Sequence, residues 1–139
     1  MPSQLLGVTS LLSVFDMPVA VQFHRDVLGF TVVSSSPEIE APEGRYFHWA
    51  WLRRGEAQLM LNTAYHAGER PPARDFHRWK GHGDTCLYFE CSDVDQLFEE
   101  LEALGLQLAR SRNAHYGMRQ LYILDPDGYT LCFQHPVRA

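Results

Sequence analysis

The side chains best suited to bind a metal or activate a substrate are three cysteines and seven histidines. Cys86, Cys91 and Cys132 are odd in number and lack the paired spacing of a zinc finger, which predicts reduced thiols and no disulfide framework. Two thiolates and a thioether could in principle hold zinc or copper(I). Unpaired cysteine is more often a small buried hydrophobic residue, and no dense cationic neighbourhood is visible in the sequence to activate these thiols.

The histidines do not form a ligand set by spacing. His115, beside Tyr116 and close to Arg119 before a predicted strand, is the best placed to touch a ligand. His24 falls on a predicted helix, where we expect a surface or interface contact, and His48 alternates with aromatic residues and should face the helix layer. Three others lie in a linker: His66, His77 and His82. No histidine has a nucleophile and an orienting acid beside it in the sequence, which argues against a catalytic role.

Two segments have the apolar spacing and the end signals of helices. The first opens near Pro18, which suits an opening turn, and stops at Gly29. The second follows Asp93, which with Gln96 resembles a capping box, and it ends at Gly105. Each helix therefore has an apolar side that must pack on another element.

The remaining regular segments alternate with period two and favour strands. Eight strands are predicted, at residues 5–15, 30–34, 46–53, 56–62, 84–91, 106–109, 120–124 and 129–134. Arg54-Gly55 and Asp125 to Gly128 are predicted as tight turns. Each half then has the order strand, helix, strand, strand, strand. We expect one α+β domain over residues 1–139, with module one at about 5–62, a linker at 63–83 and module two at about 84–135.

Strand alternation also predicts which side chains point away from the helices into a cleft between curved sheets. In the fourth, fifth and eighth strands these are Gln58, Met60, Asn62, Cys86, Tyr88, Glu90, Cys132 and Gln134. Pairing across Arg54-Gly55 adds Phe47, Trp49 and Trp51, opposite Asn62, Met60 and Gln58. This polar, soft and aromatic set is typical of a ligand cavity.

The overall composition excludes some classes of partner. A net charge of −5 and a pI near 5.7 argue against nucleic-acid binding, which needs a concentrated basic face. No apolar run approaches the length of a membrane span, and residues 1–4 lack the features of a secretory signal. The expectation is a cytoplasmic protein without membrane contact.

The chain resembles the vicinal oxygen chelate superfamily, which includes glyoxalase I, extradiol dioxygenases, fosfomycin-resistance enzymes and bleomycin-resistance proteins. The resemblance rests on residues 15–18, 23–30, 55–61, 87–95, 117–119 and 125–129. It implies two βαβββ modules forming curved mixed sheets around a cleft. The leucine-glycine-phenylalanine signature after the first helix and the Asp-Pro-Asp-Gly turn are jointly specific for this fold.

In metal-dependent members of that family, inward His, Gln or Glu side chains bind a divalent ion. The matching positions here fall on Thr9, Met60, Cys86 and Cys132. None of the four has the hard oxygen or imidazole donor that such an ion needs. The resemblance therefore implies no metal and no other cofactor.

The leading prediction is a homodimeric, bleomycin-resistance-like binder of a small molecule, in an acidic, aromatic-lined cleft and without metal. Trp49, Trp51, Phe47 and Tyr88 would stack on the ligand, and Glu90 with the net negative charge would favour a cationic aromatic molecule. One alternative is a metal-dependent lyase or dioxygenase of the same superfamily. The other is a dimeric interaction module with a vestigial cavity.

Overall fold

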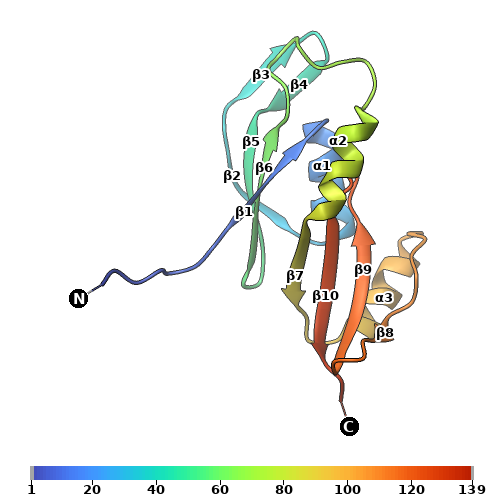
Figure 1. The fold of residues 1–139 in the computed structure, drawn as a ribbon. Helices are drawn as coiled ribbons and strands as arrows, with labels where there is room; N and C mark the ends of the chain where they lie inside the picture. Colours follow the sequence, from blue (N-terminus) through green and yellow to red (C-terminus); the bar gives the residue numbers. More distant parts are fainter. Residues whose placement is uncertain (1, 139) are drawn as a thin grey trace.

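The computed structural model describes residues 2–138 and divides them into two modules, with module one above module two in Figure 1. Module one has a sheet of order β1-β6-β5-β2, and a separate hairpin of β3 and β4. Its elements are β1 (Ser10–Val14), α1 (Met17–Gln22), η1 (Phe23–Val27), β2 (Thr31–Ser35), β3 (Glu38–Ala41), β4 (Gly44–Phe47), β5 (Trp49–Arg54) and β6 (Ala57–Thr63). Strand β1 runs parallel to β6, and the other neighbours are antiparallel.

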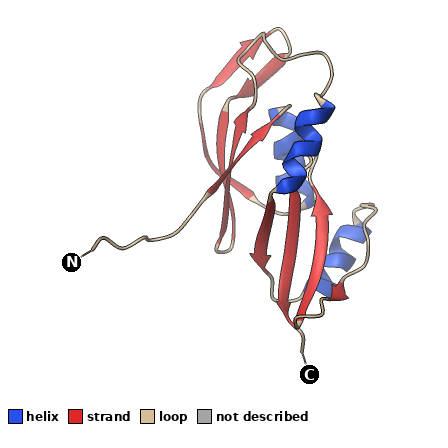
Figure 2. Cartoon of the chain, in the orientation of Figure 1, coloured by secondary structure: helices blue, strands red, loops and turns tan. Residues whose placement is uncertain are grey.

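Module two repeats the plan with a sheet of order β7-β10-β9-β8. Its elements are β7 (Cys86–Glu90), α3 (Val94–Ala103), β8 (Arg112–Asn113), β9 (Met118–Leu124) and β10 (Thr130–Pro136). The short helices α2 (Phe76–Gly81) and η2 (His82–Asp84) connect the modules. Figure 2 shows helices on one side of each sheet, which is the layered α+β arrangement expected.

Both predicted helices are present, and an aspartate caps the start of each. The Asp16 carboxylate accepts from the Val19 amide at 3.2 Å, and the helix changes to π geometry after Gln22. The Asp93 carboxylate accepts from the Gln96 amide at 3.1 Å. The Gln96 side chain donates to Glu100 on the next turn, so the second bond of a capping box is not formed.

The cores of the two modules confirm the predicted alternation. Leu59 and Leu61 of β6 are buried against α1, and Leu131 and Phe133 of β10 are buried on the side of α3. The opposite side chains of the same strands therefore face away from the helices.

Several predicted boundaries are wrong. The first strand spans only 10–14, and residues 2–8 are exposed; the stretch 46–53 is split between β4 and β5. Residues 106–109 form no strand, because the edge strand of that sheet starts at Arg112. Leu104, which lies within the span predicted for the second helix, caps its end and is 61% exposed. The linker 63–83 contains helix α2 and the start of η2.

The two modules meet through their helix-bearing sides. Phe30 packs edge-to-face on Phe89 of β7 at 6.2 Å between ring centroids, and the backbone amide of Phe15 donates to Asp127 at 2.8 Å. Phe89 points to the helix side of β7, and its neighbour Tyr88 points the other way and is 55% exposed. Module one of the same chain therefore leaves the outer face of module two uncovered.

Within residues 2–138, no helix is both long and apolar enough to cross a lipid bilayer.

Candidate ligand-binding cleft

On module one, a row of tryptophans lies on the sheet face that points away from α1. Trp49 pairs with Asn62 and Trp51 pairs with Met60 across β5 and β6. The prediction instead placed Trp49 opposite Met60, so its register was displaced along β6. The reason is that Gly55 and Glu56 form the two-residue turn, not Arg54 and Gly55. Gly55 has a φ of +57°, which suits this turn.

The interruption between β4 and β5 at His48 removes Phe47 from this row. Phe47 belongs to β4 and pairs with Glu38 in the separate hairpin. The other residues predicted for module one, Gln58, Met60 and Asn62, are half-buried on the face of the tryptophans. Thr9 lies just before β1 and is half-buried.

Polar contacts hold the Trp51 side chain in place. Its indole Nε1 donates to Gln58 Oε1 at 3.0 Å, a diagonal contact between β5 and β6. The Arg53 guanidinium carbon lies 5.1 Å from the centroid of the Trp51 ring. Arg53 pairs with Gln58, so all three residues share one face.

On module two, a hydrogen-bonded set of tyrosines and glutamines covers the corresponding face. Gln120 Nε2 donates to Gln134 Oε1 at 2.9 Å and to the Tyr116 hydroxyl at 2.8 Å. The Tyr122 hydroxyl donates to Gln120 Oε1 at 3.2 Å and lies 3.5 Å from the Tyr88 hydroxyl. The hydrogen bond to Tyr88 and desolvation raise the pKa of Tyr122, so its hydroxyl stays protonated at neutral pH.

Of these residues, only Tyr88 and Gln134 were among the predicted site residues. Alternation along β9 could have found Gln120 and Tyr122, because β9 and β10 pair Gln120 with Gln134 and Tyr122 with Cys132. The alternation was harder to recognise because the predicted strand began only at Gln120, whereas β9 begins at Met118.

The predicted thiols lie on the same face of module two. Cys86 pairs with Thr130 and Cys132 pairs with Tyr88 across the parallel strands β7 and β10. Cys132 is fully buried and Cys86 is half-buried, and all three cysteines are unbridged. Burial raises the pKa of both Cys86 and Cys132, which keeps them as neutral thiols. They are poor nucleophiles in this state.

Two residues predicted to contact a ligand lie elsewhere. Arg119 points to the helix side of β9, where its guanidinium binds the Asp95 carboxylate of α3 at 2.9 Å. His115 is exposed in the turn before β9, edge-to-face with Tyr116. It is Tyr116, through its hydroxyl bond to Gln120, that reaches the predicted face.

His24, expected to make a surface or interface contact, is fully buried at the junction of the modules. Its Nδ1 bonds the Ala20 carbonyl at 2.9 Å, so the neutral ring carries its proton there and directs Nε2 toward Asp125 Oδ2, 3.8 Å away. Desolvation by burial lowers the pKa of His24 and raises the pKa of Asp125 to about 7. The pair is therefore a structural contact between η1 and the turn at 125–128.

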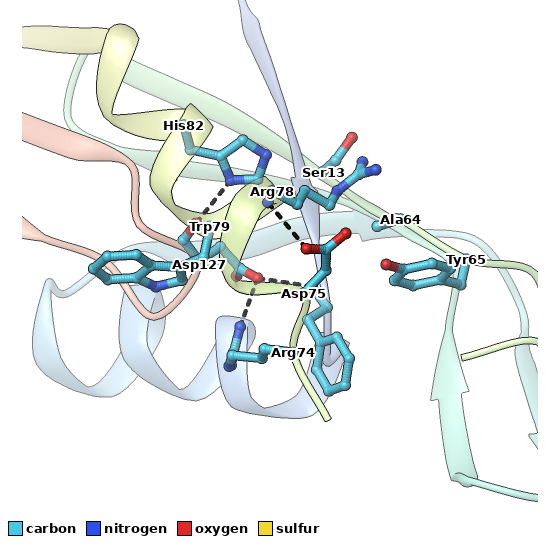
Figure 3. Close-up of a pocket in the computed structure, with 10 residues that line it drawn as sticks. Ser13, Ala64, Tyr65, Arg74, Asp75, Arg78, Trp79, His82 and Asp127 are labelled. Carbon is cyan, nitrogen blue, oxygen red and sulfur yellow. Dashed lines mark hydrogen bonds and ion pairs between the residues drawn. The ribbon is translucent and has the colours of Figure 1, made fainter. Parts of the chain in front are cut away.

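A small pocket opens beside this junction, and Figure 3 shows Arg74, Trp79, His82 and Asp127 along it. Its volume of about 20 Å³ suits a water molecule and no larger ligand. The His82 ring stacks on Tyr129 at 4.1 Å, and its Nδ1 bonds the Asp127 carbonyl. These contacts fix the linker to module two.

A larger hollow lies between the start of β6 and strand β7, with a volume of about 310 Å³. Gln58 contributes from module one, and Tyr88 and Glu90 contribute from module two. Glu56, in the turn before β6, adds a second carboxylate. The volume lies at the lower end of the range for small-molecule sites.

The side chains at the positions implied by the family resemblance do not fit a hard divalent ion. Thr9 and Met60 offer a hydroxyl and a thioether, and Cys86 and Cys132 offer protonated thiols. Across residues 2–138, no group of three or more His, Cys, Asp and Glu side chains is arranged to hold a metal ion.

Comparison with known proteins agrees with this geometry. A profile of the Glyoxalase/Bleomycin resistance protein/Dioxygenase superfamily matches residues 6–133. A search of curated protein sequences finds no significant match.

Solved structures with the same fold include two proteins that bind antibiotics. The bleomycin-binding protein of Streptomyces verticillus, complexed with copper(II)-bleomycin, is 22% identical with a TM-score of 0.67, over 95% of this chain and 97% of that one. The antibiotic-binding protein TnmS3 of Streptomyces sp. CB03234 is 22% identical with a TM-score of 0.61, over 97% and 100%. A glyoxalase/bleomycin resistance protein/dioxygenase from Nocardioides is 18% identical with a TM-score of 0.68, over 100% and 88%.

Proposed function

Because the chain belongs to the glyoxalase/bleomycin resistance protein/dioxygenase superfamily, we propose that it binds a small cationic aromatic molecule without the help of a metal ion. The observation that carries this proposal is the hollow of about 310 Å³, in which Gln58, Tyr88 and Glu90 converge from both modules. Gln58 also accepts a hydrogen bond from Trp51, so the hollow adjoins the tryptophan row.

The tryptophan row beside the hollow, Trp49 and Trp51, favours an aromatic ligand. Indole rings offer large apolar surfaces, and offset stacking contributes beyond the burial of area. The hollow supplies hydrogen-bonding groups from Gln58 and Tyr88, which would orient a ligand. Glu56 and Glu90 add negative charge, which favours a cation in the ligand.

A second copy of the chain would close the site. The face of module two carries Tyr88, Tyr116 and Leu124, which are 54 to 56% exposed, and module one of the same chain lies on the other side. Leu5, Leu6 and Val8 of the N-terminal arm are more than 90% exposed, and the arm projects from the body in Figure 1. Apolar exposure of this kind marks an interface, and a symmetric pair of chains would cover both surfaces.

Tryptophan fluorescence tests the binding proposal. The chain has three tryptophans, and Trp79 lies away from the row, with its indole bonded to the Pro126 carbonyl. A neutral polycyclic probe, anthracene-9-methanol, should quench the Trp79→Phe variant as it quenches the parent. The double variant Trp49→Phe, Trp51→Phe should lose the response.

The alternatives predict different outcomes. A vestigial cavity in an interaction module predicts no saturable quenching by any aromatic probe. A metal-dependent lyase or dioxygenase predicts one stoichiometric divalent ion per chain after purification, which elemental analysis measures. Cytoplasmic location stays a prediction, to be checked by cell fractionation.

A further inference from the structure

The proposed ligand site contains a cation supplied by the chain itself. Arg53 lies on the same face as Trp49 and Trp51, because it pairs with Gln58 across β5 and β6. Its guanidinium carbon stands 5.1 Å from the centroid of the Trp51 ring. This is within the 6 Å range in which a cation is attracted to the π face of an indole.

The Trp51 ring is held in this contact. Its Nε1 donates to Gln58 at 3.0 Å, so rotation of the ring would break a hydrogen bond. The aromatic surface that the ring offers is therefore shared between Arg53 and any ligand that stacks there.

The contact with Trp51 is the side-chain interaction that the structure gives for Arg53. In the part of the chain that the structure describes, residues 2–138, it forms no ion pair and no hydrogen bond through its side chain, whereas Arg54 binds the Leu28 carbonyl at 2.8 Å. Replacement of Arg53 would therefore leave no carboxylate without a partner, so the fold should tolerate it.

We infer that Arg53 occupies, from within the chain, the place on Trp51 that the cation of a ligand would take, and that it thereby weakens the binding of the cationic aromatic ligands that Glu56 and Glu90 attract. This inference rests on the proposed function. A cationic ligand must displace the guanidinium or accept its repulsion at short range, whereas a neutral aromatic ligand faces only the steric part of that competition.

The long-range charge of the protein does not cancel this effect. The net charge of −5 is spread over the surface, and exposed charges more than about 8 Å away are largely screened at physiological salt. At the Trp51 ring the guanidinium therefore opposes the attraction that Glu56 and Glu90 of the adjoining hollow exert on a cationic ligand.

The test compares two probes of the same shape on wild type and Arg53→Gln. Anthracen-9-ylmethylammonium carries a cation, and anthracene-9-methanol is its neutral counterpart. Removal of a competing cation–π contact should raise affinity for the ammonium probe about fivefold. Affinity for the neutral probe should change less than about twofold. Arg25→Gln, on the exposed side of η1 with Asp26 as its partner, is the control with the same change in net charge.

Each outcome decides between the proposals. Unchanged or weaker binding of the ammonium probe by Arg53→Gln would overturn the inference, and so would an equal gain in Arg25→Gln. A gain that persists in a Trp51→Leu background would show that the ring is not involved and would also overturn it. If neither probe quenches tryptophan fluorescence in any variant, the proposed function fails and the inference fails with it.

Discussion

The buried contact between His24 and Asp125 predicts a pH-dependent stability that one substitution removes. Asp125 Oδ1 accepts from the amides of Asp127 and Tyr129, both at 2.9 Å. Among residues 2–138, Oδ2 has no hydrogen-bond partner, and it lies 3.8 Å from His24 Nε2. Asp125→Asn keeps the accepting oxygen and replaces Oδ2 by an uncharged amide donor directed at that nitrogen.

The sign of the effect follows from the direction of the pKa shift. Burial raises the pKa of Asp125 from 3.8 to about 7, so the folded chain binds this proton more tightly than the unfolded chain. The stabilisation is complete below pH 4 and is lost as the pH rises through 7. Integration of a shift of this size between pH 5 and pH 8 gives a loss of about 2.5 kcal/mol.

His24 contributes with the opposite sign. Burial lowers its pKa, so the stability that its neutral ring contributes is present above pH 6.5 and is lost as the pH falls through the lowered value. Desolvation, the largest cause of this shift, acts in both proteins. The difference in unfolding free energy between wild type and Asp125→Asn therefore isolates the carboxyl group.

Urea unfolding at pH 5, 6, 7 and 8 measures that difference. Asp125→Asn should gain about 2.5 kcal/mol relative to wild type over this range. Asp84→Asn removes an exposed carboxylate of η2 and should give a profile parallel to wild type. Parallel profiles for Asp125→Asn and wild type would refute the reasoning, since they would mean that Asp125 ionises equally in the folded and unfolded states.

Three further predictions follow from the junction and the arm. Gly128→Ala should lose more than about 3 kcal/mol in urea unfolding, because its φ is +83° and a Cβ would stand 2.3 Å from the Trp79 carbonyl oxygen. Arg74→Met should lose about 2 kcal/mol, because Asp127 is 4% exposed and would lose its ion pair at 2.9 Å. Deletion of residues 2–8 should weaken the proposed self-association in analytical ultracentrifugation, because the exposed Leu5, Leu6 and Val8 would no longer be available to a second chain.

Matched controls sharpen these measurements. Gly105→Ala has a similar φ of +86° but meets no atom within 4 Å, so it should cost only about 1 kcal/mol. Arg45→Met breaks an exposed ion pair with Glu38 and should cost less than about 0.5 kcal/mol. Equal losses of stability in each matched pair would contradict the assigned causes. A dimer that survives deletion of the arm would show that the exposed sheet faces alone hold the two chains together.

Local sequence patterns predicted the fold because strand alternation, turn residues and helix caps all indicated the same elements. The apolar alternation of Leu59 and Leu61, and of Leu131 and Phe133, determines which strand faces pack on helices, and burial confirms it. The turn at 125–128 and the cap at Asp93 were likewise visible in the sequence. These signals depend on neighbours in the chain, which is why a single sequence contains them.

Contacts between distant segments were not predictable in the same way. His24 is buried beside Asp125, which is distant in the sequence and belongs to the other module. The assignment of Arg119 to the cleft failed because Asp95 on α3 captures its guanidinium. Phe47 was misplaced because the strand predicted at 46–53 is interrupted at His48, so that Phe47 joins the separate hairpin of β3 and β4.

The decisive measurement is the affinity for anthracen-9-ylmethylammonium before and after exhaustive dialysis against EDTA. Because the ring of Trp51 and the polar groups of Gln58 and Tyr88 are the proposed contacts, the dissociation constant should be unchanged by the chelator. Loss of binding after dialysis, with recovery on addition of a divalent ion, would contradict a site built from rings and hydrogen bonds alone.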